Sequence, residues 1–448
     1  MTKYHINSDK IYDFPNEISI VNYKDKILII APEKANWIVL ESKQQQYIFN
    51  LLKSGLSIEE VLKKSSIEVS DVKSVITQVE ARKFYKSSSK TIPADKTMHV
   101  YLTNRCNLSC PHCYMFSGKD SGNELKTQEI KKLICDFAQI GKGTTITFSG
   151  GEPTIRTDFD EIVMTAYELG LEVKLLTNGT QLSLERIVFL SKYISSVQIS
   201  IDGYSEESNA AIRGKGNFAK ALEAVDTFIS NGVYTAVAIT PSLESLKIHM
   251  DDYVAFAEKL SLKYADKAFE LRFSEELLNG RCISNADKVN TEYRELMSNI
   301  QKKLYGPDYK LWEFIKTLMD NPKITNCSFG NLCVSSSGEI FFCPRISDLK
   351  SIGNIRTIEF KDIMCEAENA ERLTSVVKLV PCKTCNLRYI CGGGCRIEEF
   401  PGLTFRRTFI DVNSNDFPRL ECSNLQKNMF YELMIESNEY FYNDLNGE

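Results

Sequence analysis

Short apolar runs alternate with amphipathic stretches through the middle of the chain. Five runs rich in β-branched residues have the length of buried strands: Thr144–Ser149, Glu172–Thr177, Val197–Ile201, Thr235–Thr240 and Phe269–Phe273. Between them, apolar residues recur at helical spacing in Thr127–Ile140, Asp158–Glu168, Leu184–Ser191 and Phe218–Ser230. With a further strand-like run at Met98–Thr103, this order predicts an α/β fold whose parallel sheet forms a barrel or partial barrel. Active sites of such barrels lie at the carboxyl ends of the strands.

The first ninety residues follow a different pattern. Three short strands are predicted, at Ile18–Asn22, Ile27–Ala31 and Trp37–Glu41. Helical sequence follows them, at Gln44–Lys53, Ser57–Lys64 and Ser70–Ala81. The serine run Ser87–Ser89 is typical of a linker. This pattern predicts a small module that is separate from the barrel.

Three closely spaced cysteines follow the run Met98–Thr103. Cys106, Cys110 and Cys113 have the spacing C-x3-C-x2-C. Three thiolates can hold three irons of a four-iron, four-sulfur cluster and leave the fourth iron without a protein ligand. Structural metal sites close with four protein ligands, so this spacing favours a cluster that binds a small molecule. A zinc knuckle is the alternative.

Eight more cysteines crowd the C-terminal third of the chain. They are Cys327, Cys333, Cys343, Cys382, Cys385, Cys391, Cys395 and Cys422. Four of them, from Cys382 to Cys395, have the spacing C-x2-C-x5-C-x3-C. Eight thiolates in one region predict further metal sites, either iron–sulfur clusters or two structural zinc ions.

Composition and charge argue against several classes of function. The chain has 448 residues, which suits two or three domains, and a formal net charge of -5 without a dense basic cluster, so we expect no nucleic-acid partner. No apolar run is long enough to span a membrane, and Met1–Lys10 is too polar for a signal peptide. We therefore expect a cytoplasmic location and no membrane partner. In that reducing compartment, 14 cysteines indicate metal binding rather than disulfides.

The cysteine loop and the turns after the strands resemble the radical S-adenosylmethionine (radical SAM) superfamily. Tyr114 follows the third cysteine, and the GGE turn at 150–152 is similar to one that meets the amine of SAM. The resemblance implies that the cysteine loop holds the catalytic cluster, whose open iron chelates SAM, and that cleavage of SAM yields a 5′-deoxyadenosyl radical. It also implies SAM contacts for a set of residues: Tyr114, Gly150, Gly151, Glu152, Asn178, Ser200, Asp202 and Arg213. For Arg213, a solvated charge at a helix end is the alternative.

The C-terminal cysteines are similar to those of the SPASM domain, which follows many radical SAM barrels and carries two auxiliary four-iron clusters. By this resemblance, the first auxiliary cluster is ligated by Cys327, Cys333, Cys343 and Cys395. The second is ligated by Cys382, Cys385, Cys391 and Cys422. Four thiolates for each cluster leave no open iron. The chain is then expected to hold three four-iron clusters and SAM.

The N-terminal module resembles the winged-helix-like RiPP recognition element, which binds the leader of a ribosomally made, post-translationally modified peptide. In that element the third strand and third helix flank a groove, and the leader adds to the sheet as a further strand. The physical requirement is an exposed strand edge. An oligomerisation module or a DNA-binding-like winged helix is the alternative.

The whole chain thus resembles the radical SAM–SPASM peptide maturases of the sactipeptide, ranthipeptide and streptide type. The implied order is a leader-binding domain at 1–90, a partial (β/α)6 radical SAM barrel at 91–310 and a cysteine-rich SPASM domain at 311–448. The implied reaction abstracts hydrogen from a precursor peptide and closes an intramolecular thioether or carbon–carbon cross-link. A flavodoxin or ferredoxin is the expected reductant.

Other classes of function stay open from the sequence. One is a radical SAM enzyme that matures sulfatases by forming formylglycine; it would not need the N-terminal module. Another is a peptide epimerase, and a third is a zinc-binding scaffold without catalysis. Colour separates the last from the rest, because an iron–sulfur protein prepared without oxygen is brown.

Overall fold

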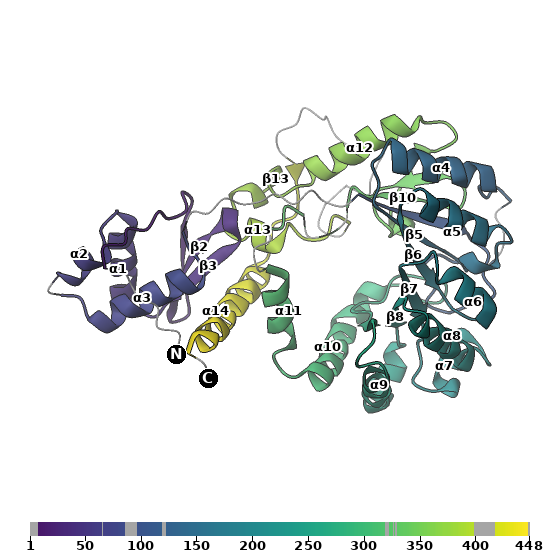
Figure 1. The fold of residues 1–448 in the computed structure, drawn as a ribbon. Coiled ribbons are helices and arrows are strands. Elements are labelled where there is room, and N and C mark those ends of the chain that lie inside the picture. The colour runs from purple at the N-terminus through teal and green to yellow at the C-terminus, as the bar shows by residue number, and fades with distance from the viewer. Residues whose placement is uncertain are drawn as a thin grey trace.

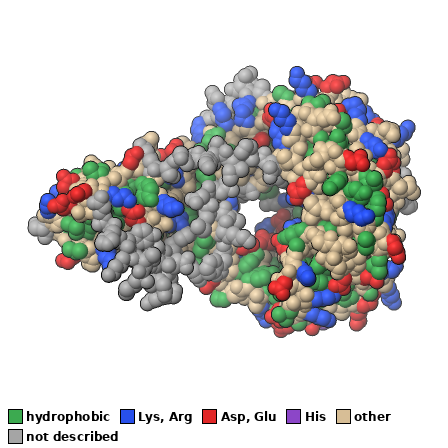
Figure 2. Space-filling model, viewed as in Figure 1, with side chains coloured by type: hydrophobic (Ala, Val, Ile, Leu, Met, Phe, Trp, Pro, Cys, Tyr) green, Lys and Arg blue, Asp and Glu red, His purple; other side chains and the backbone are tan. Residues whose placement is uncertain are grey.

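The computed structural model describes residues 8–64, 66–85, 96–118, 122–318, 322–325, 327, 329–397 and 417–446. Figure 1 shows a small N-terminal module at one end and a large α/β barrel at the other, with much of the C-terminal third between them. On the barrel face seen in Figure 2, acidic and basic side chains are interspersed. None of the helices in the described ranges combines the length and hydrophobicity that a bilayer span needs.

The N-terminal module has the predicted three strands followed by three helices. The antiparallel sheet has the order β1 (Ser19–Tyr23), β2 (Lys26–Ala31) and β3 (Asn36–Leu40), with the short turn η1 (Pro32–Lys34) before β3. The helices are α1 (Lys43–Lys53), α2 (Ile58–Leu62) and α3 (Val69–Ala81). Ser42 caps α1, and Ser57 forms a capping box at the start of α2. These bounds lie within two residues of the predicted ones.

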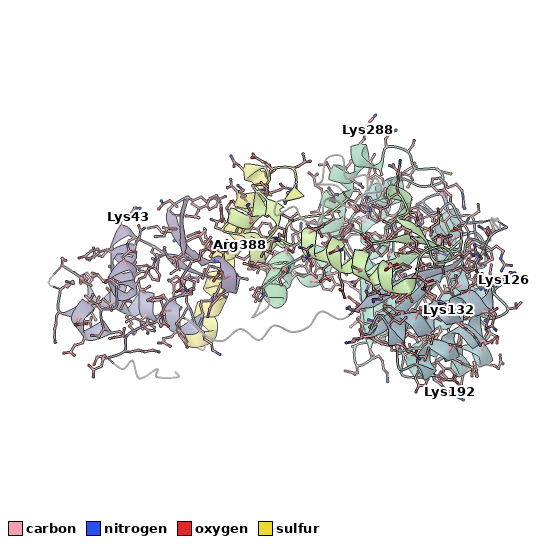
Figure 3. The ribbon with its side chains drawn as sticks, turned by 90° about the horizontal axis from the view of Figure 1, so that it is seen from above. Lys43, Lys126, Lys132, Lys192, Lys288 and Arg388 are labelled. Carbon is pink, nitrogen blue, oxygen red and sulfur yellow. The ribbon has the colours of Figure 1, made fainter. Side chains whose placement is uncertain are left out.

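Both faces of this small sheet are buried. Ile29 and Ile38 pack with the module's own helices, whereas Leu28 and Trp37 on the opposite face pack against C-terminal helices. Those helices are α11 (Tyr309–Leu318), α13 (Arg388–Cys391) and α14 (Asn424–Asn446). The indole Nε1 of Trp37 donates to the Met434 carbonyl over 2.9 Å, and Arg388, labelled in Figure 3, pairs with Glu17. The N-terminal module is therefore anchored to the end of the chain.

The barrel is built from parallel strands in chain order, which confirms the predicted α/β fold. They are β4 (Thr97–Thr103), β5 (Thr145–Gly150), β6 (Glu172–Thr177), β7 (Ser196–Ser200), β8 (Tyr234–Ile239) and β9 (Phe269–Phe273). The helices and one short turn are α4 (Thr127–Gln139), η2 (Pro153–Ile155), α5 (Phe159–Glu168), α6 (Leu184–Leu190), α7 (Glu206–Arg213), α8 (Phe218–Ser230), α9 (Leu243–Lys263) and α10 (Ala286–Tyr305). Because β9 ends the sheet, the barrel is partial.

Side chains along β4 point alternately into the hydrophobic core and into the interior of the barrel. Met98, Val100 and Leu102 belong to the hydrophobic core beneath the helices. Successive side chains of a strand point to opposite faces, so His99 and Tyr101 face the interior of the barrel.

The C-terminal third extends the barrel sheet beyond β4. Strand β10 (Leu332–Val334) pairs with β4 in parallel, and β11 (Glu339–Phe341) and β12 (Gly353–Asn354) follow as an antiparallel pair. A nine-stranded sheet results. The remaining elements are η3 (Ile346–Asp348), α12 (Phe360–Leu373), β13 (Leu379–Val380), η4 (Cys382–Thr384) and β14 (Phe417–Pro418).

Candidate functional site

A pocket of about 320 Å³ opens at the carboxyl ends of the barrel strands. All three cysteines of the loop after β4 line it. So do most of the other residues predicted to contact SAM, namely Tyr114, Gly150, Gly151, Asn178, Ser200 and Arg213. The structure therefore brings together side chains that lie more than one hundred residues apart in the sequence. Glu152 and Asp202 are not among the lining residues.

The two glycines of the GGE turn allow β5 to approach the cysteine loop closely. A Cβ atom on Gly151 would lie 2.2 Å from the Arg105 carbonyl oxygen, and one on Gly150 would lie 2.3 Å from the Thr103 oxygen. Because neither residue has a Cβ atom, the two backbones can come close enough for the Gly151 amide to donate to the Thr103 carbonyl over 2.8 Å. The backbone of the turn thus fixes the start of the cysteine loop, as only glycine permits.

Glu152 holds two neighbouring turns together beneath the pocket. Its fully buried carboxylate accepts hydrogen bonds from the Thr177 hydroxyl and the Asn178 amide, both over 2.7 Å, and from the Thr154 hydroxyl over 2.6 Å. Burial raises the pKa of Glu152, although these hydrogen bonds favour the charged form. The carboxylate therefore fixes Asn178, which does line the pocket.

Asp202 positions Arg213 in a similar way. Its buried Oδ2 atom accepts from Arg213 Nε over 2.6 Å and lies 3.2 Å from His112 Nε2, while Oδ1 accepts from the Thr240 amide. Burial alone would raise the pKa of Asp202, but Arg213 and His112 outweigh it and hold the pKa below its usual range. His112 lies within the cysteine loop, so this contact also ties the loop to the end of β7.

Arg281, which follows β9, clamps the other side of the cysteine loop. The sequence alone predicts no role for this residue. Arg281 Nη1 donates to the Ser109 hydroxyl over 2.9 Å and to the Cys110 carbonyl over 3.1 Å, and Nη2 donates to the Ser117 carbonyl. A Cβ on Gly280 would lie 2.8 Å from the His112 carbonyl oxygen. In the sequence, the only hint of this clamp is the pair Gly280-Arg281 after the last strand of the barrel.

Three cysteine thiols are the characteristic donors of the pocket. Among the described residues, no three His, Cys, Asp or Glu side chains are arranged to hold one metal ion. Burial raises the pKa of Cys106 to about 11 and also raises that of Cys110, so metal binding would release protons from these thiols. Three thiols around one pocket, without a fourth protein ligand among the lining cysteines, fit a cluster with one open iron.

Residues 100–244 match the family model for the radical SAM superfamily. The chain contains a radical SAM domain. It is 29% identical over 315 residues to mycofactocin maturase MftC of Mycolicibacterium smegmatis, covering 67% of this chain and 77% of that protein. It is 26% identical over 380 residues to the PqqA peptide cyclase of Bradyrhizobium diazoefficiens, covering 81% and 96%.

A solved structure of anSMEcpe with bound AdoMet shares the fold. Its TM-score is 0.54 at 18% identity, over 78% of this chain and 99% of that one. The family implies a four-iron cluster and SAM for the radical SAM domain, and the pocket described above has residues that suit both.

Outside the radical SAM domain, the eight C-terminal cysteines fall into two neighbourhoods. The pKa of Cys343 is raised to about 11, first by burial and then by the nearby thiols of Cys327 and Cys395. Burial also raises the pKa of Cys333, which lies beside Cys343. A separate cavity of about 260 Å³ is lined by Cys382, Cys385, Cys391, Cys395 and Cys422. Cys395, which the sequence assigns to the first cluster, lies near Cys343 and also lines this cavity, so the division into two ligand sets stays a prediction.

Two tyrosines connect the radical SAM pocket with the first of these neighbourhoods. The hydroxyls of Tyr114 and Tyr101 are 3.2 Å apart, and Tyr101 donates to the Pro344 carbonyl over 2.6 Å. Pro344 directly follows Cys343. Burial raises the pKa of Tyr114 to about 12, so its hydroxyl stays protonated.

In the N-terminal module, the edge of β3 is already hydrogen-bonded. Gln78 of α3 accepts from the Val39 amide over 2.8 Å and donates to the Val39 carbonyl. Arg82 donates to the Trp37 carbonyl over 3.2 Å, with its guanidinium 4.1 Å from the centre of an indole ring. The third strand therefore lacks the open edge that the sequence analysis expected of a leader-binding groove.

Proposed function

We propose that this chain is a radical SAM peptide maturase that cross-links a ribosomally made precursor peptide. One observation carries the proposal: the three thiols of the cysteine loop and Arg213 face one pocket at the mouth of a radical SAM barrel. The names of its homologues, a mycofactocin maturase and a PqqA peptide cyclase, support a peptide as substrate.

Each part of the pocket has a role in this proposal. Cys106, Cys110 and Cys113 hold the cluster, and Arg213 pairs with the carboxylate of SAM. The remaining SAM contacts come from Tyr114, Gly150, Gly151, Asn178 and Ser200. When bound, the cluster and SAM supply one-electron chemistry that begins with hydrogen abstraction from the peptide.

Asp202 acts through Arg213 rather than by touching SAM. The Arg213 guanidinium, whose side chain is only 13% exposed, needs a counter-charge, and Asp202 provides it through Nε, which leaves the terminal nitrogens to a ligand. Glu152 acts in the same indirect way through Asn178.

Closing one thioether or carbon–carbon cross-link removes two hydrogen atoms from the peptide. The first leaves in the hydrogen abstraction. The second leaves as a proton and an electron, and the electron needs an acceptor. Two auxiliary clusters would supply such an acceptor: Cys327, Cys333, Cys343 and Cys395 would hold one, and Cys382, Cys385, Cys391 and Cys422 would hold the other. A flavodoxin or ferredoxin would supply the electron that starts each turnover.

We assign leader binding to the N-terminal module, with the domain bounds 1–90, 91–310 and 311–448. Addition of a strand to β3 requires Gln78 to leave Val39. The opposite edge, β1, has no hydrogen bond from the described residues to the outer backbone groups of Ile20 and Asn22. This edge meets the physical requirement for strand addition.

The first experiment is an iron and sulfide count on anaerobically reconstituted protein, together with an assay for 5′-deoxyadenosine after reduction by dithionite. We expect about twelve irons and deoxyadenosine. Replacing all three cysteines of the loop by Ala should leave about eight irons and no deoxyadenosine. Zinc in place of iron would overturn the proposal.

Mass spectrometry tests the product. Any short peptide that is encoded beside this chain's gene serves as the probe and is produced together with the enzyme. Each cross-link should lower the mass of the peptide by two hydrogen atoms, whereas epimerisation would leave the mass unchanged in ordinary water. Deletion of residues 1–90 should abolish the modification; unchanged modification would favour a sulfatase-maturing type of enzyme.

A further inference from the structure

One buried histidine in the barrel has an unused hydrogen-bonding atom. His99 lies on β4 and faces the barrel interior, and its Nε2 atom is buried without a hydrogen-bond partner among the described residues. An imidazole carries at least one N–H in either protonation state, and with the proton on Nε2 that atom can only donate. A buried polar group without a partner costs about 1–3 kcal/mol, so its position calls for an acceptor.

The sheet register places this histidine beside the C-terminal cysteines. His99 on β4 pairs with Cys333 on β10, and residues in register on parallel strands project to the same face. Tyr101, two residues further along, has its ring centroid 4.6 Å from that of His99 and shares a buried cluster with Cys333. The Tyr101 hydroxyl donates to Pro344, next to Cys343. His99 therefore lies against the neighbourhood of Cys333 and Cys343.

We propose that His99 Nε2 donates a hydrogen bond to a sulfur atom of the auxiliary cluster held by Cys327, Cys333, Cys343 and Cys395. The assignment rests on the proposed function, which places a cluster there. Hydrogen bonds to cluster sulfurs favour the reduced form, because that form carries one more negative charge. His99 is thus a positioning residue that raises the reduction potential of this cluster and helps it to accept the electron released when the cross-link closes.

Redox titration followed by electron paramagnetic resonance tests the assignment. The background is the full chain with C106A, C110A and C113A, in which only auxiliary clusters contribute. His99→Phe keeps an aromatic ring beside Tyr101 but removes the donor, so one auxiliary potential should fall while the other stays unchanged. His99→Gln keeps an amide donor and should restore most of that potential. His249→Phe, at a half-exposed histidine of α9, is the matched control and should change neither potential.

Each outcome decides the matter. Full iron content with unchanged potentials in His99→Phe overturns the hydrogen bond and leaves the proposed function standing. A background protein without iron overturns the auxiliary clusters themselves. Equal shifts of both potentials indicate general distortion and also contradict the inference. If His99→Phe fails to fold, pulsed resonance on the unsubstituted protein, with 15N in its histidines only, still decides, since the reduced cluster should couple to one 15N nucleus and absence of that coupling overturns the hydrogen bond.

Discussion

The mouth of the barrel and the edge of the N-terminal sheet are both places where the sequence predicts a ligand, and they differ in how much the chain already satisfies them. At the mouth, three thiols and Arg213 face a pocket of about 320 Å³. At β3, the amide and carbonyl of Val39 are both bonded to the side chain of Gln78.

The difference shows what each kind of resemblance can predict. The barrel prediction depends on residue types whose chemistry restricts where they can lie, such as thiols that share a cluster and glycines that admit a neighbouring backbone. The prediction for the module depends on the order of strands and helices. That order predicts the elements, but the side chains of Gln78 and Arg82 decide which edge is open.

The largest effect should come from Gly151→Ala, which attacks the barrel mouth. The added Cβ would meet the Arg105 carbonyl oxygen at 2.2 Å and displace the start of the cysteine loop. We expect at least about a 100-fold loss of deoxyadenosine formation, since misplacement by about 1 Å can have that effect. We also expect the loss of about four irons.

Gly232→Ala is the matched control for this variant. Unlike Gly151, Gly232 has a positive φ, and a Cβ there would contact nothing, so the variant carries about 1–2 kcal/mol of backbone strain without approaching the pocket. It should keep its iron and its activity. A normal iron content in Gly151→Ala would mean that the close approach of the two turns is dispensable.

A smaller effect is expected from Arg213→Lys. The guanidinium can bond Asp202 through Nε and still present its terminal nitrogens to a ligand, whereas the single nitrogen of lysine cannot serve both. The dissociation constant for SAM, measured by equilibrium dialysis, should rise about tenfold, or about 1.4 kcal/mol. Iron content should not change.

Arg356→Lys provides the comparison, because Arg356 forms a forked pair with Glu129 outside the pocket. The affinity of the Arg356→Lys variant for SAM should equal that of the unsubstituted chain. If Arg213→Lys binds SAM equally well, Arg213 serves only to neutralise Asp202.

Much of the barrel is predictable from sequence, because strand runs such as Glu172–Thr177 and the cysteine spacing are local. Contacts between distant segments are not. Asp202 meets His112 only through the fold, and the Arg281 clamp joins segments separated by more than 160 residues. Likewise, no local pattern indicates that β10 extends the barrel sheet beside β4.

Arg281→Met tests the barrel mouth in a milder way, because it weakens the hold on the cysteine loop and leaves the three thiols unchanged. The guanidinium of Arg281 donates to Ser109, Cys110 and Ser117 of the loop. A methionine is nearly as long but makes none of these hydrogen bonds. We expect iron to be lost to a chelator about three to ten times faster, which corresponds to about one hydrogen bond in net strength. Arg272→Met, on β9 and away from the loop, should not change the rate. Equal rates in both variants would show that the clamp is unnecessary.

The last variant concerns the closed edge of β3 and leaves the barrel mouth unchanged. Gln78→Ala leaves the buried amide and carbonyl of Val39 without partners, which costs about 1–3 kcal/mol. Hydrogen exchange of the Val39 amide should therefore become about tenfold faster or more. Thr77→Ala changes the preceding residue on the same helix, whose hydroxyl bonds only within α3, and should leave that amide protected. If Gln78→Ala also binds the precursor peptide more tightly, the leader adds to β3 after all. The edge of β3 would then be a ligand site like the barrel mouth, except that Gln78 competes with the peptide for the backbone of Val39.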